Sequence, residues 1–385
     1  MNYNNRVEND STMTMKVVCA VAFVTFTFLF LFFSQADVLA VAQHVLSKGV
    51  TAYSPLVGAL LITAVLYLLQ RGLNTFFKIN RRQHWLTYFP SMLTLTVVTD
   101  ISPDIDRQFT FGGWLWVFPL LMLVWFLATL AISKVQNCEA DINSRGLFSR
   151  LVWVNVLPMG VMMMLCGIVS ANDTMFHYRA KMEHLMVDRH FEEAAAVGKK
   201  SIEADSSLTM LRCYALARQG RMADEMFKYA VCGTSQTILP SAKGTRMMLY
   251  PVDSLYCFLG AKPRATMTAK QYLKALQLSG YKSKAIADYI LCGLLMDRNL
   301  DGFVKELPRH YAVNDSLPLH YREALTLYTH RRANPLVIYH NQVMDTDFDD
   351  LQKLEDESKE ASARKLAVSE QYFGTYWWYF DYGRK

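Results

Sequence analysis

Five apolar stretches, separated by short polar segments, fill the N-terminal part of the chain. They occupy residues 17–33, 55–69, 85–99, 114–132 and 151–169. A helix needs roughly 20 apolar residues to cross a bilayer. Aromatic side chains, which favour the membrane–water interface, mark several ends of these stretches: Tyr53, Trp85, Trp114, Trp116 and Trp153. The pattern predicts a polar tail at 1–14 and a bundle of about five transmembrane helices over 15–171.

The stretch at 85–99 is the weakest of the five, because it contains Pro90 and several Thr, although no charge occurs before Asp100. If it does not cross the membrane, four spans remain and the rest of the chain changes sides. A second alternative concerns 17–33, which a signal peptide would explain, since Ser34-Gln35-Ala36 resembles a cleavage site. The apolar run is long for a signal peptide, and its loss would not move the C-terminal half.

Lys and Arg are distributed unequally between the two sides of a five-span bundle. One side carries nine: Arg6, Lys16, Arg71, Lys78, Arg81, Arg82, Lys134, Arg145 and Arg150. The other side carries only Lys48 and Arg107. Because cytoplasmic loops are enriched in Lys and Arg, we expect a bacterial inner-membrane protein with a cytoplasmic N-terminus and a periplasmic C-terminal domain. A four-span bundle would give a poorer ratio of seven to four.

The C-terminal half, 172–385, has the charge content of a soluble domain, with 29 of the 40 Lys and Arg and 26 of the 34 Asp and Glu. Its apolar residues have helical spacing, and one predicted helix face is formed by Phe191, Ala194, Ala195, Gly198 and Ile202. Phe191 and Met222 hold equivalent places 31 positions apart. This half resembles tetratricopeptide repeats, well over 174–230 and loosely over 266–332, which implies stacked helical hairpins. Gly198 and Ser201 depart from that pattern, and an irregular helical bundle is the alternative.

Further helices are predicted beyond residue 265. Thr268 to Gln271 forms a capping box that opens a helix ending at Ser279-Gly280. We expect a helix at 283–297, another beginning near 315–318, and one long charged helix at 347–372. The chain then ends in an aromatic run that includes Trp377 and Trp378. Such a cluster must be buried, either in the last groove of the helical domain or at the membrane surface.

Residues 233–265 are predicted to be a long basic loop. Pro interrupts the segment three times, and it carries Lys243, Arg246 and Arg264. Long loops are often functional, so this one is a candidate for binding anionic lipid or polysaccharide. The alternative is an insertion that packs over the helices.

Composition excludes several functions. The net charge of +6 is divided equally between the halves, which does not indicate a nucleic-acid partner. None of the seven Cys forms a C-x-x-C pair. Four of them, Cys213, Cys232, Cys257 and Cys292, lie in the C-terminal half and are either free thiols or paired in an oxidising compartment. No cofactor is expected.

Two groups of residues suggest metal or acid–base chemistry. Asp100, Asp104 and Asp106 lie in one predicted external loop, where carboxylates could hold a divalent metal for a lipid-linked sugar transferase; the alternative is that acids are simply tolerated there. His310, His320, His330 and His340 recur every ten residues, which is a rotation of roughly 280° on a helix, so neighbours do not share a face. We therefore expect no catalytic, cofactor-binding or metal residues among them.

The membrane-spanning front, the Ala215–Met222 segment leading to Met226-Phe227, and the closing Thr375-Tyr376-Trp377-Trp378-Tyr379 together resemble an uncharacterised family of multi-pass membrane proteins from Bacteroidota. The resemblance implies an inner-membrane location and no particular activity. We expect a membrane-anchored scaffold whose helical-repeat domain binds a protein of a cell-envelope assembly. The alternative is a lipid- or polysaccharide-processing enzyme that uses the Asp100–Asp106 loop.

Overall fold

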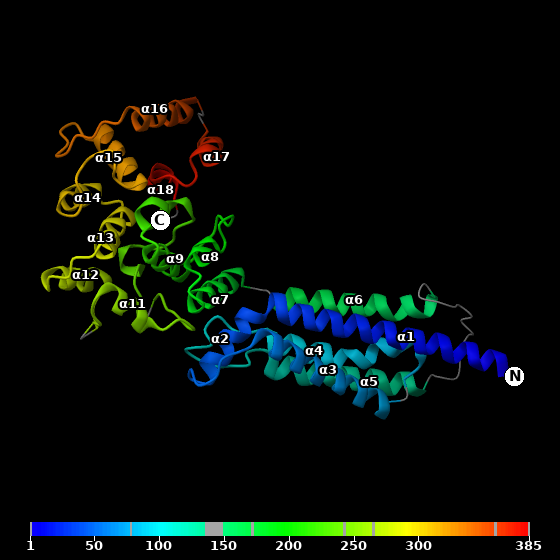
Figure 1. The fold of residues 1–385 in the computed structure, drawn as a ribbon. Coiled ribbons are helices and arrows are strands. Elements are labelled where there is room, and N and C mark those ends of the chain that lie inside the picture. The colour runs from blue at the N-terminus through cyan, green and yellow to red at the C-terminus, as the bar shows by residue number, and fades with distance from the viewer. Residues whose placement is uncertain are drawn as a thin grey trace. The chain divides into compact units, whose positions relative to one another are not determined.

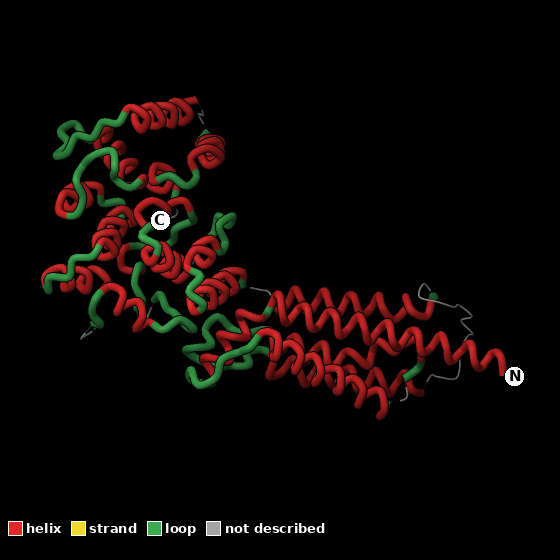
Figure 2. The backbone as a smooth tube through the Cα atoms, viewed as in Figure 1, coloured by secondary structure: helices red, strands yellow, loops and turns green. Residues whose placement is uncertain are grey.

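The computed structural model describes residues 2–77, 79–134, 149–170, 173–241, 244–263, 266–357 and 360–383. Within these ranges every regular element is a helix, which confirms the predicted all-α fold (Figure 2). The chain divides into two compact units: unit 1, Met1–His177, and unit 2, Tyr178–Lys385.

Unit 1 is a bundle of apolar helices that run alongside one another (Figure 1). Its elements are α1 (Asn2–Leu29), a π-helical turn (Phe30–Ser34), α2 (Ala36–Leu46), α3 (Pro55–Phe76), a 3-10 helix (Arg81–Tyr88), α4 (Phe89–Thr99), α5 (Trp114–Lys134) and α6 (Arg150–Ser170). Among the described residues, four helices are long and apolar enough to cross a bilayer: Ser11–Ser34, Pro55–Phe76, Trp114–Ile132 and Arg150–Ser170. Four of the five predicted spans are therefore confirmed as helices that could cross a membrane.

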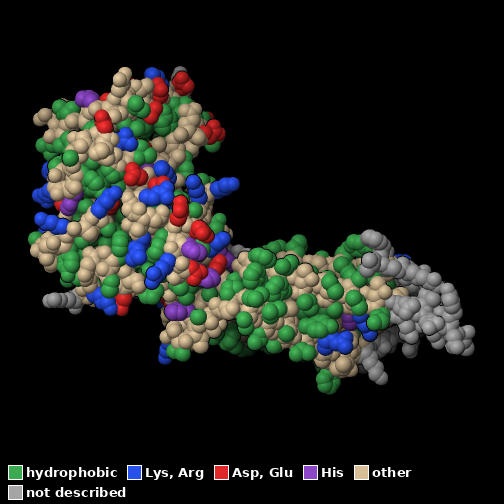
Figure 3. All heavy atoms as spheres, viewed as in Figure 1, with side chains coloured by type: hydrophobic (Ala, Val, Ile, Leu, Met, Phe, Trp, Pro, Cys, Tyr) green, Lys and Arg blue, Asp and Glu red, His purple; other side chains and the backbone are tan. Residues whose placement is uncertain are grey.

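Most of the surface of these four helices is apolar and points outward. Only 11% to 22% of the most apolar window of each helix is buried. Leu61 and Trp116 are 61% and 78% exposed, and hydrophobic side chains cover much of the visible face of the bundle (Figure 3). Helices of a water-soluble bundle direct an apolar stripe inward instead, so this surface is compatible with a membrane protein.

The fifth predicted span, 85–99, is not among these helices. Its residues are divided between the 3-10 helix and α4, which has 11 residues and is about 17 Å long at 1.5 Å per residue. The segment nevertheless lies in the interior of the bundle, since its residues Tyr88, Leu95 and Thr99 are almost completely buried. It follows α6 from one end to the other: Asn155 donates to the Arg81 carbonyl at 2.9 Å, and the Thr99 and Ser170 hydroxyls lie 2.7 Å apart.

Neutral polar side chains attach this segment to three neighbouring helices. The Gln70 amide of α3 donates to the Thr87 hydroxyl, and the Trp125 indole of α5 donates to the Leu86 carbonyl, both at 2.8 Å. From α6, the Asn155 side chain also accepts a hydrogen bond from the Trp85 amide at 3.0 Å. Since an apolar interior offers no water to satisfy these groups, the hydrogen bonds fix the segment in one position.

Unit 2 consists of shorter helices. They are α7 (Thr174–Val187, which begins before the unit boundary), α8 (Phe191–Ala196), α9 (Ser206–Arg218), α10 (Met222–Glu225), α11 (Val252–Leu259), α12 (Ala269–Leu278), α13 (Lys284–Met296), α14 (Leu300–Glu306), α15 (Leu319–Arg331), α16 (Gln342–Glu357), α17 (Ala361–Tyr372) and α18 (Tyr376–Tyr382), with 3-10 turns at Met226–Lys228, Ser235–Thr237 and Leu307–Arg309. The capping box predicted at Thr268 and Gln271 is present and opens α12.

Three local predictions in unit 2 are wrong. The helix beginning at Phe191 ends at Ala196, because Gly198 has a φ of +67°, and Ile202 is consequently 79% exposed rather than on a buried face. The long helix expected at 347–372 is two helices, α16 and α17. The loop expected at 233–265 contains α11.

The aromatic C-terminal end is buried in the interior of unit 2. α18 packs on α15, and the Phe227 ring lies 5.1 Å from that of Tyr376 and 4.7 Å from that of Tyr379. The Glu323 carboxylate of α15 accepts a hydrogen bond from the Tyr376 amide at 2.7 Å. Of the two expected locations, the structure favours the domain interior over the membrane surface.

Replacing Asn155 with Leu tests the attachment of the buried segment in unit 1. The change removes the hydrogen bonds that the Asn155 side chain makes with the Trp85 N–H and the Arg81 C=O, which should cost about 1–3 kcal/mol. We expect a clearly lower melting temperature for the detergent-purified protein. Met164→Leu, at a position of α6 that is 59% exposed, is the control and should melt like the wild type. Equal melting of both variants would contradict the proposed attachment.

Candidate functional site

The acidic loop between α4 and α5 spreads its three carboxylates instead of gathering them. Asp100 accepts a hydrogen bond from the Trp114 indole at 2.6 Å. Asp104 and Asp106 are exposed, and the Asp104 backbone carbonyl accepts from the Arg107 and Gln108 amides in a tight turn. Across the described parts of the chain, no group of three or more His, Cys, Asp or Glu is placed to hold a metal ion.

A cavity of about 590 Å³ lies behind this loop, within unit 1. Its walls come from α2, the start of α3, the end of α4 and the loop itself, and they include Leu39, Ala42, Tyr53, Val97, Asp100 and Ile105. The sequence predicted the loop but not the cavity, because no helix was expected between the stretches at 17–33 and 55–69. In the structure this region contains α2, whose residues Val38 to Ala42 are buried. The apolar run of that segment was the available signal.

Tyr53 is the least satisfied polar side chain of the cavity wall. A Cβ on Gly58 would overlap the Tyr53 ring, so the glycine lets the ring lie directly on α3. The Tyr53 hydroxyl is buried and has no hydrogen-bond partner among the described residues.

A buried carboxylate of unit 2, that of Glu183 on α7, contacts the middle of the predicted basic loop. One oxygen of Glu183, on α7, accepts from the amides of Met248, Leu249 and Tyr250 at 2.6–2.8 Å. Burial raises the pKa of Glu183 to about 7, although these hydrogen bonds and nearby Arg179 oppose the rise. The loop is thus held against α7 at 248–250. Arg246 is half-buried there, while the other basic candidates, Lys243 and Arg264, lie outside the described residues.

Two further buried acids in unit 2 serve as links between helices. Asp288 of α13 accepts from the hydroxyls of Tyr311 and Tyr321 at 2.6 and 2.9 Å, and burial raises its pKa. Glu323 lies 2.8 Å from His320, whose other ring nitrogen accepts from the Phe227 amide. These groups connect helices of unit 2 through hydrogen bonds.

The C-terminal tryptophans are also structural. Trp377 is 2% exposed, and its indole donates to the Glu323 carbonyl. Trp378 is half-buried and donates to the Ser369 hydroxyl at 2.8 Å. Cys213, Cys232, Cys257 and Cys292 are free.

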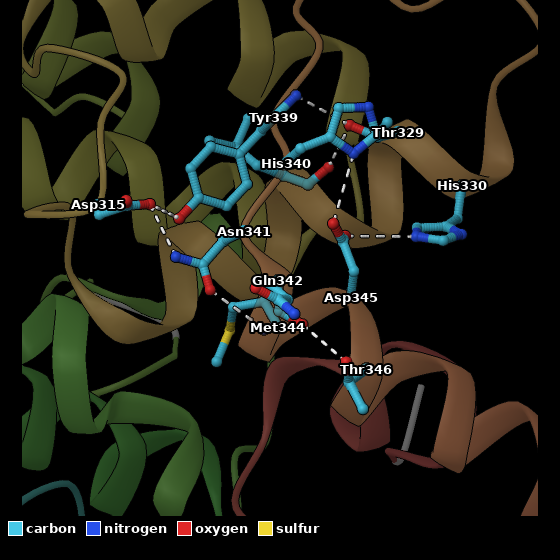
Figure 4. A network of polar contacts seen from close by, with 11 residues as sticks. Asp315, Thr329, His330, Tyr339, His340, Asn341, Gln342, Met344, Asp345 and Thr346 are labelled. Atoms are coloured by element: carbon cyan, nitrogen blue, oxygen red, sulfur yellow. Dashed lines mark hydrogen bonds and ion pairs between the residues drawn. The ribbon is translucent and has the colours of Figure 1, made fainter.

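The clearest surface feature of unit 2 is the segment 335–343, which comprises the end of the connection after α15 and the first two residues of α16; we call it the pinned segment. Its backbone is fixed from several sides. The Leu336 amide donates to the Tyr328 hydroxyl. The Tyr339 amide donates to the Thr329 hydroxyl (Figure 4). Asp315 accepts from Tyr339 and from Asn341. Those two hydrogen bonds hold the pKa of Asp315 below its ordinary value.

The same segment brings together two histidines that were expected to lie apart. His330 and His340 meet at the Asp345 carboxylate, with N–O distances of 3.5 and 3.4 Å (Figure 4). The expectation was wrong for this pair because the chain from Arg332 to Asn341 is not helical and folds back over α15. The ion pairs hold the end of the pinned segment on α16.

The pinned segment exposes apolar side chains although its backbone is fixed. Leu336, Ile338 and Val343 are 66%, 64% and 66% exposed. Tyr339, between them, is buried and anchors the segment. The sequence analysis missed this surface; the run of four apolar residues at 336–339 was the signal for it.

Across the residues that the structure describes, the fold is all-helical, with four helices able to cross a membrane in unit 1 and shorter helices in unit 2. The sequence profile of a family of unknown function (DUF6057) matches residues 101–273 and 264–383, so the chain belongs to that family. This confirms the expected membership of an uncharacterised family. No curated protein and no solved structure matches the chain.

Replacing Glu183 with Gln tests the buried carboxylate. Its pKa is about 7 in the folded protein and 4.5 as the ordinary value. The contribution of Glu183 to the free energy of unfolding is therefore most favourable below pH 4.5, where the carboxyl is protonated in both the folded and the unfolded protein. This contribution falls by about 3 kcal/mol as the pH rises to 7. Gln keeps the acceptor but cannot ionise, so the pH dependence should flatten.

The measurement is hydrogen exchange at the 248–250 amides between pH 4.5 and 8, corrected for the intrinsic rate. Glu370→Gln, at an exposed position of α17, is the control and should behave like the wild type. An unchanged pH dependence in Glu183→Gln would show that another group is responsible.

Proposed function

We propose that this protein is a membrane-anchored adaptor of the bacterial inner membrane, whose unit 2 presents the pinned segment to a protein partner of a cell-envelope assembly. Unit 1 is the anchor. Unit 2 acts as a degenerate tetratricopeptide-like domain in the periplasm, within a family of Bacteroidota membrane proteins. α8 packs on α9, and α12 packs on α13, so that each pair of helices adjacent in the chain forms a hairpin. These two hairpins support the interpretation of unit 2 as repeat-like.

The topology rests on the path of the buried segment. Because 81–99 follows α6 from Asn155 to Ser170, it adds a fifth passage to the four helices of spanning length. Five passages put the two ends of the chain on opposite sides. The Lys and Arg bias of the loops then favours a cytoplasmic N-terminus.

The exposed apolar residues of the pinned segment are the observation that carries the adaptor function. Exposed apolar side chains that gather on one surface commonly mark interaction sites. Here the backbone beneath Leu336 and Ile338 is already fixed by hydrogen bonds, so a partner would not have to order it. Binding to a pre-organised segment avoids part of the entropy cost of association.

A reporter fused after Lys385 tests the topology. Alkaline phosphatase, which is active only in the periplasm, should be active in this fusion, and green fluorescent protein should not be fluorescent. Fusions after Lys78 are the matched control, because that loop is expected on the cytoplasmic side and should give the opposite pair of results. Cytoplasmic signals from the C-terminal fusion would overturn the five-passage arrangement.

A pull-down tests the partner surface. The double variant Leu336→Ser/Ile338→Ser should lose a partner that co-purifies with the wild type in mild detergent by at least about tenfold, because removing the few residues that carry most of an interface's binding energy costs about 2 kcal/mol or more. The control variant Leu278→Ser/Leu366→Ser removes two equally exposed apolar side chains elsewhere in unit 2 and should retain the partner. Recovery of the wild-type protein without a specific partner would contradict the adaptor function.

A further inference from the structure

The cavity behind the Asp100 loop lies where several apolar helices end. Tyr53 lies two residues before the start of α3, Asp100 follows α4, and Trp114 is the first residue of α5. Phe109 and Phe111, from the loop, are 51% and 56% exposed. Tyr and Trp favour the boundary between the acyl chains and the headgroups, so in a membrane the cavity lies at headgroup level. This placement rests on the proposed membrane anchoring of unit 1.

The cavity wall has the two chemical characters of a phospholipid site. It is mainly apolar, with Leu39, Val97 and Ile105 among its residues, and its volume lies within the usual range of small-molecule pockets. Among the described residues that line it, Asp100 is the only charged one. The Trp114 indole holds that carboxylate in place at 2.6 Å.

We propose that this cavity binds one molecule of a zwitterionic phospholipid whose headgroup carries a primary ammonium, as in phosphatidylethanolamine. An acyl chain occupies the apolar walls, and the ammonium donates hydrogen bonds to Asp100. An anionic lipid without an ammonium is disfavoured because its phosphate would meet the Asp100 carboxylate with no compensating cation. The quaternary ammonium of phosphatidylcholine has no N–H group to donate a hydrogen bond to the carboxylate.

The test is native mass spectrometry of the full-length protein in detergent, incubated with equal amounts of dioleoyl phosphatidylethanolamine, phosphatidylglycerol and phosphatidylcholine. We expect one retained phosphatidylethanolamine, favoured by about tenfold, as a charge-assisted hydrogen bond would give. Asp100→Asn keeps an acceptor for the Trp114 indole and removes only the charge, so the preference should disappear. Asp106→Asn makes the same change at an exposed loop position outside the cavity wall and should leave the preference intact.

Ala42→Phe fills the cavity from α2 and should reduce retention of all three lipids. Equal retention of the three lipids by the wild type, or a preference that survives Asp100→Asn, would overturn the proposal. Loss of the preference in both Asp100→Asn and Asp106→Asn would also overturn it, because general loop charge would then be responsible. The isosteric Asp100→Asn variant decides the outcome even if Ala42→Phe does not fold. A failure here with the C-terminal reporter still periplasmic would refute the lipid site alone and leave the anchoring proposal standing.

Discussion

Unit 1 depends on satisfying the backbone of 81–99 inside an apolar bundle. A buried N–H or C=O without a partner costs free energy comparable to a lost hydrogen bond. The Asn155 side chain hydrogen-bonds to two backbone groups at once, the Trp85 N–H and the Arg81 C=O. These two hydrogen bonds fix the register of α6 against the segment. At the far end, the contact between Thr99 and Ser170 places the end of α4, and with it the Asp100 loop and the cavity.

Unit 2 solves the same problem with carboxylates. Glu183, Asp288 and Glu323 each accept hydrogen bonds from residues distant in the chain, over separations of 65–67, 23–33 and 53 positions. Breaking such a buried set leaves an uncompensated polar group, which is strongly destabilising. Each acid therefore favours one arrangement of its helices over alternatives that bury the same apolar area.

Local patterns in the sequence predicted what depends on local physics. The apolar runs located the four long helices, the capping box at Thr268 located α12, and the helix expected at 283–297 is α13. Features set by distant contacts were not predictable in this way. The meeting of His330 and His340 needs the fold-back of the chain after α15, and the cavity needs α2 to lie beside the Asp100 loop. Gly198 departs from the repeat pattern, but the departure alone did not predict the positive φ that ends α8.

The interiors of the two units differ in the kind of polar group they accept. The buried polar side chains that the structure describes in unit 1 are Thr, Ser, Gln, Asn and His, whereas those in unit 2 include Arg179, Glu183, Arg212, Asp288 and Glu323. A charge inside a bilayer is expensive, while a water-surrounded domain can bury an acid if its hydrogen bonds are complete. The contrast supports different surroundings for the two units by an argument that does not use hydropathy or helix length. Asp100 fits the same rule, since this charged member of the cavity wall lies beyond the last residue of α4, where the apolar helix has ended.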